Sequence, residues 1–311
     1  MQWVYNDFFI KLLARSRLAL LSKLSLFSGN QSSWDDQPNG LLKGFKGQYE
    51  LSKRKTAETI IWDVFAEYSA LESWLNEMFS EDNESLPSFD YILWPNNHQQ
   101  APKLLVFDMD STFIQIEVID ELATRHGVGE SVSEVTEAAM RGELDFAESL
   151  ISRVACLKGL VDSTIDDISH NLPLSKGVDQ LVDICKTQDV KIAVVSGGFT
   201  PFVSHLQQTM GLYRVKANDL EIANGELTGR VLGSIVDANA KAMFVNELKD
   251  ELNLNRNEIM TIGDGANDLV MMAETGFNLA YRAKPAVQAQ SKGRMNITDL
   301  NQLVDIFDWS N

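Results

Sequence analysis

The chain has 311 residues, with 44 acidic and 27 basic side chains and a formal net charge of −17. This charge disfavours nucleic acid, whose phosphates attract basic surfaces, and no apolar run approaches the roughly 18 residues that a membrane span requires. Two cysteines are too few for a disulfide framework, which predicts packed thiols and a reducing, cytoplasmic location.

Residues 1–100 form a region whose role the sequence does not identify. Residues 8–27 are apolar with interspersed basic side chains, which is typical of an amphipathic helix that packs on its own protein or lies on a membrane surface. Residues 28–40 are rich in loop formers, and residues 57–79 carry apolar and aromatic side chains broadly on one side, which predicts a second helix. Because strand alternation is not evident, we predict a mostly helical or α+β region.

Three short apolar segments after residue 100 each end in polar residues suited to chemistry. They are residues 103–107, 191–195 and 259–262, which predict buried strands. Ligands of open α/β sheets bind at the carboxyl ends of the strands, so these polar groups are expected to face a common cleft. The first strand runs into Asp108 and Asp110, and an ordinary turn would seldom place a second acid there.

The other polar groups follow in chain order. After the second strand, the Ser196 hydroxyl and the bare backbone N–H of Gly197 are suited to phosphate oxygens. Lys241 lies near the start of a predicted helix, and taken alone it is most simply a solvated charge. Residues 263–268 follow the third strand and again place acids at its carboxyl end.

Two local patterns predict helix starts and one predicts a hairpin. Ser131 and Glu134 match a capping box, and Asp145 is suited to cap the next helix. Asn224 and Gly225 lie between two apolar segments, which predicts a β-hairpin that completes the sheet.

Taken in order, these segments resemble the haloacid dehalogenase superfamily of phosphatases: Asp-x-Asp-x-Thr, then Ser, then Lys, then Gly-Asp-Gly-x-x-Asp. A finer resemblance, over about residues 103–308, is to the phosphoserine phosphatase family. It implies an α/β fold with a Rossmann-like parallel core, formed by residues 101–117 and 186–311, and a helical cap inserted at residues 118–185. The implied activity is hydrolysis of O-phospho-L-serine to L-serine and inorganic phosphate, the last step of L-serine biosynthesis.

The same resemblance implies roles for the acidic residues and the lysine. Asp108 is the nucleophile that forms an aspartyl-phosphate, and Asp110 is the general acid and base. Mg²⁺ is held by the side chains of Asp108 and Asp264 and by the main-chain carbonyl of Asp110. Lys241 is a fixed cation beside the nucleophile and the phosphoryl oxygens, and Asp268 steers Lys241 or a metal-bound water.

The resemblance further implies which residues hold the substrate. The expected phosphate ligands are Ser196, the Gly197 amide and Lys241, and Asn267 helps to orient the phosphate or the substrate. In the cap, Arg153 pairs with the substrate carboxylate, Glu117 accepts its ammonium group, and Met140 and Phe146 cover the site. From the residues alone, Met140 and Phe146 could equally be helix-packing residues. Arg153 and Glu117 could be surface charges, as such residues usually are.

Two other functions stay open at this point. One is a related small-molecule phosphatase or phosphotransferase whose cap accepts another phosphorylated amino acid or alcohol. The other is a non-catalytic sensor of a phosphorylated ligand, although each catalytic residue type is present. A homodimer is also left open.

Overall fold

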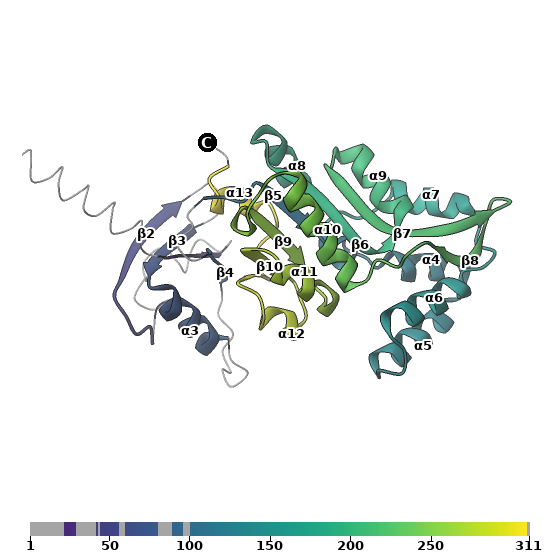
Figure 1. The fold of residues 1–311 in the computed structure, drawn as a ribbon, viewed down its shortest axis with the longest axis horizontal. Helices are drawn as coiled ribbons and strands as arrows, with labels where there is room; N and C mark the ends of the chain where they lie inside the picture. Colours follow the sequence, from purple (N-terminus) through teal and green to yellow (C-terminus); the bar gives the residue numbers. More distant parts are fainter. Residues whose placement is uncertain are drawn as a thin grey trace, which may run out of the picture.

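The computed structural model describes residues 22–28, 42, 44–55, 60–79, 89–95 and 100–309. One sheet of 11 strands runs through this part of the chain, in the order β2-β3-β1-β4-β11-β10-β9-β5-β6-β7-β8 (Figure 1). Helices pack on the faces of its central part and form a separate group beyond β6 (Figure 1). The α/β fold with a parallel core is therefore confirmed.

The central strands of the sheet are parallel. They are β11 (Gly293–Met295), β10 (Phe277–Tyr281), β9 (Ile259–Gly263), β5 (Leu104–Phe107), β6 (Lys191–Phe199) and β7 (Arg214–Ala223). Strands β5, β9 and β10 are buried along their whole length, because helices cover both faces of a parallel sheet. The three strands predicted after residue 100 are confirmed as β5, β6 and β9. They are neighbours, so their carboxyl ends lie side by side.

Helices cover the two faces of this central sheet. One face packs on α8 (Val178–Thr187), α9 (Thr200–Met210) and α13 (Gln302–Ile306). The other packs on α10 (Ala238–Glu251), α11 (Leu269–Ala273) and α12 (Pro285–Gln288). Single 3₁₀ turns precede β9 (Arg256–Glu258) and α11 (Ala266–Asp268). Alternate residues of β5 point to the two faces, so each face has its own apolar cluster.

The cap helices lie between β5 and β6 in the sequence. They are α4 (Val118–His126), α5 (Gly129–Met140), α6 (Phe146–Cys156) and α7 (Asp162–His170). Asp145 caps α6 in a capping box with Glu148, as predicted. The capping box predicted at Ser131 and Glu134 is wrong, because α5 begins at Gly129 and both residues lie inside it. The next helix, α8, contacts β6 and α13, so the chain returns to the core before residue 185.

The predicted hairpin is present and has a second role. Strand β7 turns through Asn224 and Gly225, both with positive φ, into β8 (Glu226–Leu232). Backbone hydrogen bonds link this hairpin to the cap: Gly159 N donates to the carbonyl of Leu227 and Leu227 N to that of Leu160, each at 2.8 Å. The hairpin therefore completes the sheet and also binds the cap.

The N-terminal region is α+β, which confirms the second form of that prediction. Strands β1 (Ser22–Ser28), β2 (Tyr49–Lys55), β3 (Ile60–Ala66) and β4 (Asp90–Leu93) pair antiparallel, with α3 (Tyr68–Met78) between β3 and β4 in sequence. Strand β4 also pairs with β11, so this small sheet continues the core sheet.

Of two helix predictions in this region, the one at residues 57–79 is confirmed over α3 and wrong over residues 60–66, and the one at residues 8–27 is wrong over its described residues. Residues 60–66 form β3 rather than the start of a helix, and residues 22–27 lie in β1. Residues 60–64 are all buried, so β3 lacks the alternation of buried apolar and exposed polar residues that would have indicated a strand. Residues 8–21 of the first predicted helix, and most of the loop predicted at residues 28–40, lie outside the described part of the chain.

Asp90 on β4 fastens the C-terminal segment to the N-terminal sheet. Its fully buried carboxylate accepts hydrogen bonds from the backbone N–H groups of Asn296, Ile297 and Thr298 and from the Thr298 hydroxyl, at 2.7–3.2 Å. Burial raises the pKa of Asp90, and these hydrogen bonds oppose the rise. Without this carboxylate, the loop amides would be buried without acceptors.

We therefore expect Asp90→Ala to lower the free energy of unfolding by about 2–3 kcal/mol, because buried N–H groups lose their acceptor. Urea unfolding followed by circular dichroism measures this change. The control is Asp299→Ala, which removes an exposed ion pair with Arg282 and is expected to cost less than about 1 kcal/mol. Equal decreases in the free energy of unfolding of the two variants would contradict the anchoring role of Asp90.

Candidate active site

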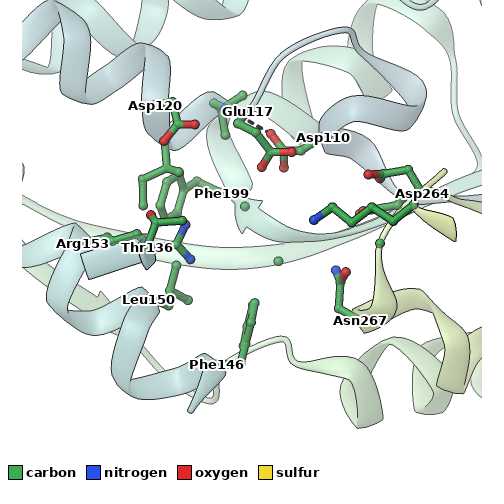
Figure 2. Close-up of a pocket in the computed structure, with 17 residues that line it drawn as sticks. Asp110, Glu117, Asp120, Thr136, Phe146, Leu150, Arg153, Phe199, Asp264 and Asn267 are labelled. Carbon is green, nitrogen blue, oxygen red and sulfur yellow. Dashed lines mark hydrogen bonds between the residues drawn. The ribbon is translucent and has the colours of Figure 1, made fainter. Parts of the chain in front are cut away.

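A cavity of about 370 Å³ opens at the carboxyl ends of the central strands, between the core and the cap. Figure 2 shows side chains from both sides facing it, with Arg153, Leu150 and Phe146 opposite Asp264 and Asn267. The residues predicted from the sequence that line it are Asp108, Asp110, Glu117, Phe146, Arg153, Gly197, Asp264 and Asn267. The structure thus brings together groups separated by more than a hundred residues in the chain.

A buried lysine joins two of the predicted acids. The Lys241 ammonium group lies 2.7 Å from Asp108 Oδ1 and 2.7 Å from Asp268 Oδ1, and the lysine is 1% exposed. Burial alone would lower the pKa of Lys241, but the two carboxylates outweigh it and raise the pKa. Lys241 is therefore a fixed, protonated cation. The alternative that it is a solvent-exposed charge on a helix is wrong.

The turn after β5 presents Asp108 to the cavity. Asp108 N donates to the carbonyl of Ile262 on β9, and the side chain accepts from Met109 N at 2.8 Å. The chain then makes a tight π-type turn over Met109–Phe113, with Ser111 at φ 55°. Asp108 Oδ1 is thus held by Met109 N and Lys241, whereas Oδ2 has no hydrogen-bond partner among the described residues.

Asp110 is held in place from two sides. Its Oδ1 accepts from Val118 N at 2.8 Å, and its Oδ2 accepts from the Ser196 hydroxyl at 3.0 Å. Burial, followed by the charge of Glu117, raises the pKa of Asp110 to about 7. A carboxyl group with this pKa can both give and take a proton near neutral pH.

Ser196 is positioned by the glycines that follow it. It is fully buried, and its hydroxyl accepts from Gly198 N at 2.8 Å while donating to Asp110. A Cβ atom on Gly198 would lie 2.7 Å from Asp110 Oδ2, so a side chain at this position would displace Asp110. Gly197 lines the cavity, whereas Ser196 lies behind it, against Asp110.

The acidic groups are suited to a divalent cation. One carboxylate oxygen each of Asp108, Asp264 and Asp268 lies within 4.8 Å of the others. Asp268, however, uses Oδ1 for Lys241 and Oδ2 for the backbone N–H groups of Asp264 and Gly265. Asp264 has one oxygen bound to the Thr112 hydroxyl at 3.1 Å, and burial raises its pKa to about 6. The residues present therefore fit a metal held by Asp108 and Asp264, with Asp268 in support.

The cap side of the cavity carries one arginine. Arg153 is partly buried and makes no ion pair with any residue that the structure describes. Burial lowers its pKa, although Asp120 and Glu117 oppose this. Glu117 accepts a hydrogen bond from the Ser111 hydroxyl at 2.7 Å. A partly desolvated, unpaired guanidinium beside two acids is suited to a ligand that has both a carboxylate and an ammonium group.

The two predicted covering residues differ in position. Phe146, at the start of α6, lines the cavity, and its ring is so close to Gly197 that a Cβ there would lie 2.9 Å from it. Met140, at the end of α5, is 82% exposed and does not line the cavity. Its predicted covering role is therefore not reproduced in this arrangement of the cap.

Several residues that line the cavity were missed by sequence reasoning. Among them are Asp120, Thr136, Leu150 and Lys284. Asp120 lies one helical turn after Glu117, so the spacing of three residues could have indicated it. Lys284 comes three residues after the end of β10, a strand end that the sequence analysis did not consider.

Comparisons with known proteins identify the family of this chain. Residues 102–276 match the family described as haloacid dehalogenase-like hydrolase. The phosphoserine phosphatase of Idiomarina loihiensis is 44% identical over 201 residues, which cover 65% of this chain and 91% of that protein. The enzyme of that name from Saccharomyces cerevisiae is 39% identical over 269 residues, covering 85% of each chain. Other matching phosphoserine phosphatases are longer, and 62–64% of their length is covered.

A solved structure also covers the N-terminal region. The probable phosphoserine phosphatase of Vibrio cholerae superposes with a TM-score of 0.74 at 34% identity, over 94% of this chain and 88% of that one. The chain therefore belongs to the haloacid dehalogenase-like hydrolases. Within this family, the relatives described above are phosphoserine phosphatases. No helix in the described part of the chain has the length and apolar character needed to cross a membrane.

The contacts of Lys241 predict its contribution to stability. Lys241→Met leaves Asp108 and Asp268 buried without their common cation, so we expect the free energy of unfolding to fall by about 3–5 kcal/mol. The control is Lys249→Met on the same helix, which removes a hydrogen bond from the lysine ammonium group to Asn246 and should cost less than about 1 kcal/mol. Urea unfolding in metal-free buffer measures both, and a Lys241 variant as stable as wild type would contradict the interpretation.

Proposed function

We propose that this protein hydrolyses O-phospho-L-serine to L-serine and inorganic phosphate, as the final reaction of L-serine formation. The observation that carries the proposal is one cavity with two ends. Asp108, Asp110 and Asp264 lie at its core end, and an unpaired Arg153 lies at its cap end. A phosphate monoester fits the first end, and the carboxylate of an amino acid fits the second.

In the proposed first step, a carboxylate oxygen of Asp108 bonds to phosphorus while the bond from phosphorus to the serine oxygen breaks. Asp108 Oδ2 has no protein partner in the described structure, so it is available to the phosphorus or to a metal ion. Asp110 gives its proton to the departing serine oxygen. A pKa of about 7 makes the protonated form accessible near neutral pH.

In the second step, a water molecule attacks phosphorus and Asp110 takes its proton. The bond between phosphorus and Asp108 then breaks, which releases inorganic phosphate and restores both carboxyl groups. Ser196 holds Asp110 through its hydroxyl, and Val118 N holds the other oxygen, so the same group stays in place for both proton transfers. Lys241 remains protonated beside Asp108 throughout.

We propose Mg²⁺ as the cofactor, held by the carboxylates of Asp108 and Asp264 and by the main-chain carbonyl of Asp110. When bound, the ion offsets the repulsion between a phosphate dianion and the nucleophile. Asp268 supports this site, because it binds the amides of Asp264 and Gly265 and the Lys241 ammonium group together.

We also propose that Arg153 pairs with the substrate carboxylate and that Glu117 accepts the ammonium group. The Gly197 amide and Asn267 are assigned to the phosphate, since both line the cavity. Phe146 covers the site, and the same role for Met140 stays a prediction that requires the cap to move. The division into core and cap, the cytoplasmic location and a homodimer also remain predictions.

The nucleophile is tested by phosphate release from L-phosphoserine with Mg²⁺. We expect Asp108→Asn to lower kcat by at least about 10³-fold, because an amide cannot form the aspartyl-phosphate. Asp250→Asn, an exposed substitution on α10, is the control and should keep wild-type activity. Substantial turnover by Asp108→Asn would refute the proposed mechanism.

The substrate is tested by Arg153→Gln with two phosphate esters. For L-phosphoserine we expect kcat/KM to fall about tenfold to hundredfold, since the pair between a guanidinium and a carboxylate is lost. For phosphoethanolamine, which has no carboxylate, we expect little change.

The control for this second test is Arg125→Gln, which removes an exposed cap arginine paired with Glu121 and Asp167. It should leave both substrates unaffected. If Arg153→Gln impaired the two substrates equally, Arg153 would not recognise the carboxylate.

A further inference from the structure

The cavity presents an electrostatic problem for an anionic substrate. Five acidic side chains line it, namely Asp108, Asp110, Glu117, Asp120 and Asp264. The chain as a whole carries a formal charge of −17, so its overall field also repels a phosphate dianion. Lys241 cannot attract a distant anion well, because it is buried and already paired with two carboxylates. The proposed Mg²⁺ offsets part of this charge when bound, and an exposed cation at the cavity favours capture of the substrate further.

Two basic side chains line the cavity in the described structure, Arg153 and Lys284. They come from opposite sides, since Arg153 lies on α6 of the cap and Lys284 lies between β10 and α12 of the core. With Arg153 assigned to the substrate carboxylate, Lys284 is the cation that remains for the phosphate end.

The backbone holds Lys284 beside the phosphate end. Its N–H donates to the main-chain carbonyl of Asp264 at 3.1 Å, and Pro285 follows it as the first residue of α12. The side chain is exposed, and its ammonium group makes no ion pair with any described residue. An exposed lysine is usually only a solvated charge, but the backbone N–H of this one binds Asp264, and its charge acts on the Asp264 carboxylate without forming an ion pair with it.

We propose that Lys284 captures the phosphate group of the substrate at the mouth of the cavity. This inference rests on the proposed function and adds a substrate-binding residue to it. Lys284 supplies the attraction that brings the dianion past the acidic lining, and Asp108, Lys241 and the Gly197 amide then receive it. Its charge acts on substrate capture and phosphate binding, so it affects kcat/KM more than kcat.

Lys284→Gln tests the proposal, with Lys284→Arg to restore the charge. Arg282→Gln is the matched control, because it removes one positive charge two residues away from an exposed ion pair with Asp299 that does not line the cavity. Two measurements are made with Mg²⁺ at low and high ionic strength. They are the Kd of inorganic phosphate by calorimetry, and kcat and kcat/KM for L-phosphoserine and p-nitrophenyl phosphate.

At low ionic strength we expect Lys284→Gln to weaken phosphate binding and to lower kcat/KM, each by about tenfold, with kcat within about twofold of wild type. High ionic strength should reduce the difference between Lys284→Gln and wild type in phosphate Kd and in kcat/KM. Lys284→Arg should recover most of the lost phosphate affinity and kcat/KM. An equal loss in Arg282→Gln would show an effect of net charge and overturn the proposal. An unchanged phosphate Kd in Lys284→Gln would also overturn it.

The test of Lys284 can be distinguished from the test of the proposed function. If the wild-type protein released no phosphate from L-phosphoserine, the proposed substrate would be wrong. The phosphate Kd and the turnover of p-nitrophenyl phosphate would still decide whether Lys284 captures a phosphate group.

Discussion

The active-site geometry depends on one buried cation between two buried carboxylates. Lys241 joins Asp108 on the loop after β5 to Asp268 on the loop after β9, and Lys241 itself comes from α10. Asp268 in turn binds the amides of Asp264 and Gly265. Charges buried this deeply are stable only as a complete set, since one left alone costs several kcal/mol. Asp108, Asp264 and Lys241 therefore adopt their positions together, which arranges the site before any ligand binds.

Much of this site could be predicted from the sequence, because its residues follow buried strands. The strands β5, β6 and β9 are short apolar segments, and a parallel sheet brings their carboxyl ends together whatever the separation along the chain. Lys241 was different, because its side chain lies on a helix where most lysines are solvated. Only its place in the order of motifs indicated a role. Lys284 follows a strand whose end carries no acid, so no sequence pattern drew attention to it.

The predictions failed where local sequence does not determine the surroundings. Strand β3 was taken for a helix because helix α3 covers one of its faces and the main apolar core covers Ile61 on the other, which removes the alternation that identifies a strand. The position of Met140 depends on how the cap lies over the core, and that is a property of tertiary packing. The same limit applies to Asp90, whose four donors lie more than 200 residues further along the chain.

The contact between the β7–β8 hairpin and the cap has a mechanical consequence. The backbone of residues 159–162 forms hydrogen bonds with the hairpin, while α4 joins the cap to the loop that bears Asp110. The hairpin thus adds an attachment of the cap to those made by its chain connections and by the contacts of α7 with α9. A rotation of the cap that widened the entrance for a substrate would have to bend the β7–β8 hairpin or replace its hydrogen bonds to the cap by hydrogen bonds to water. The stiffness of the hairpin therefore limits how far the entrance can open.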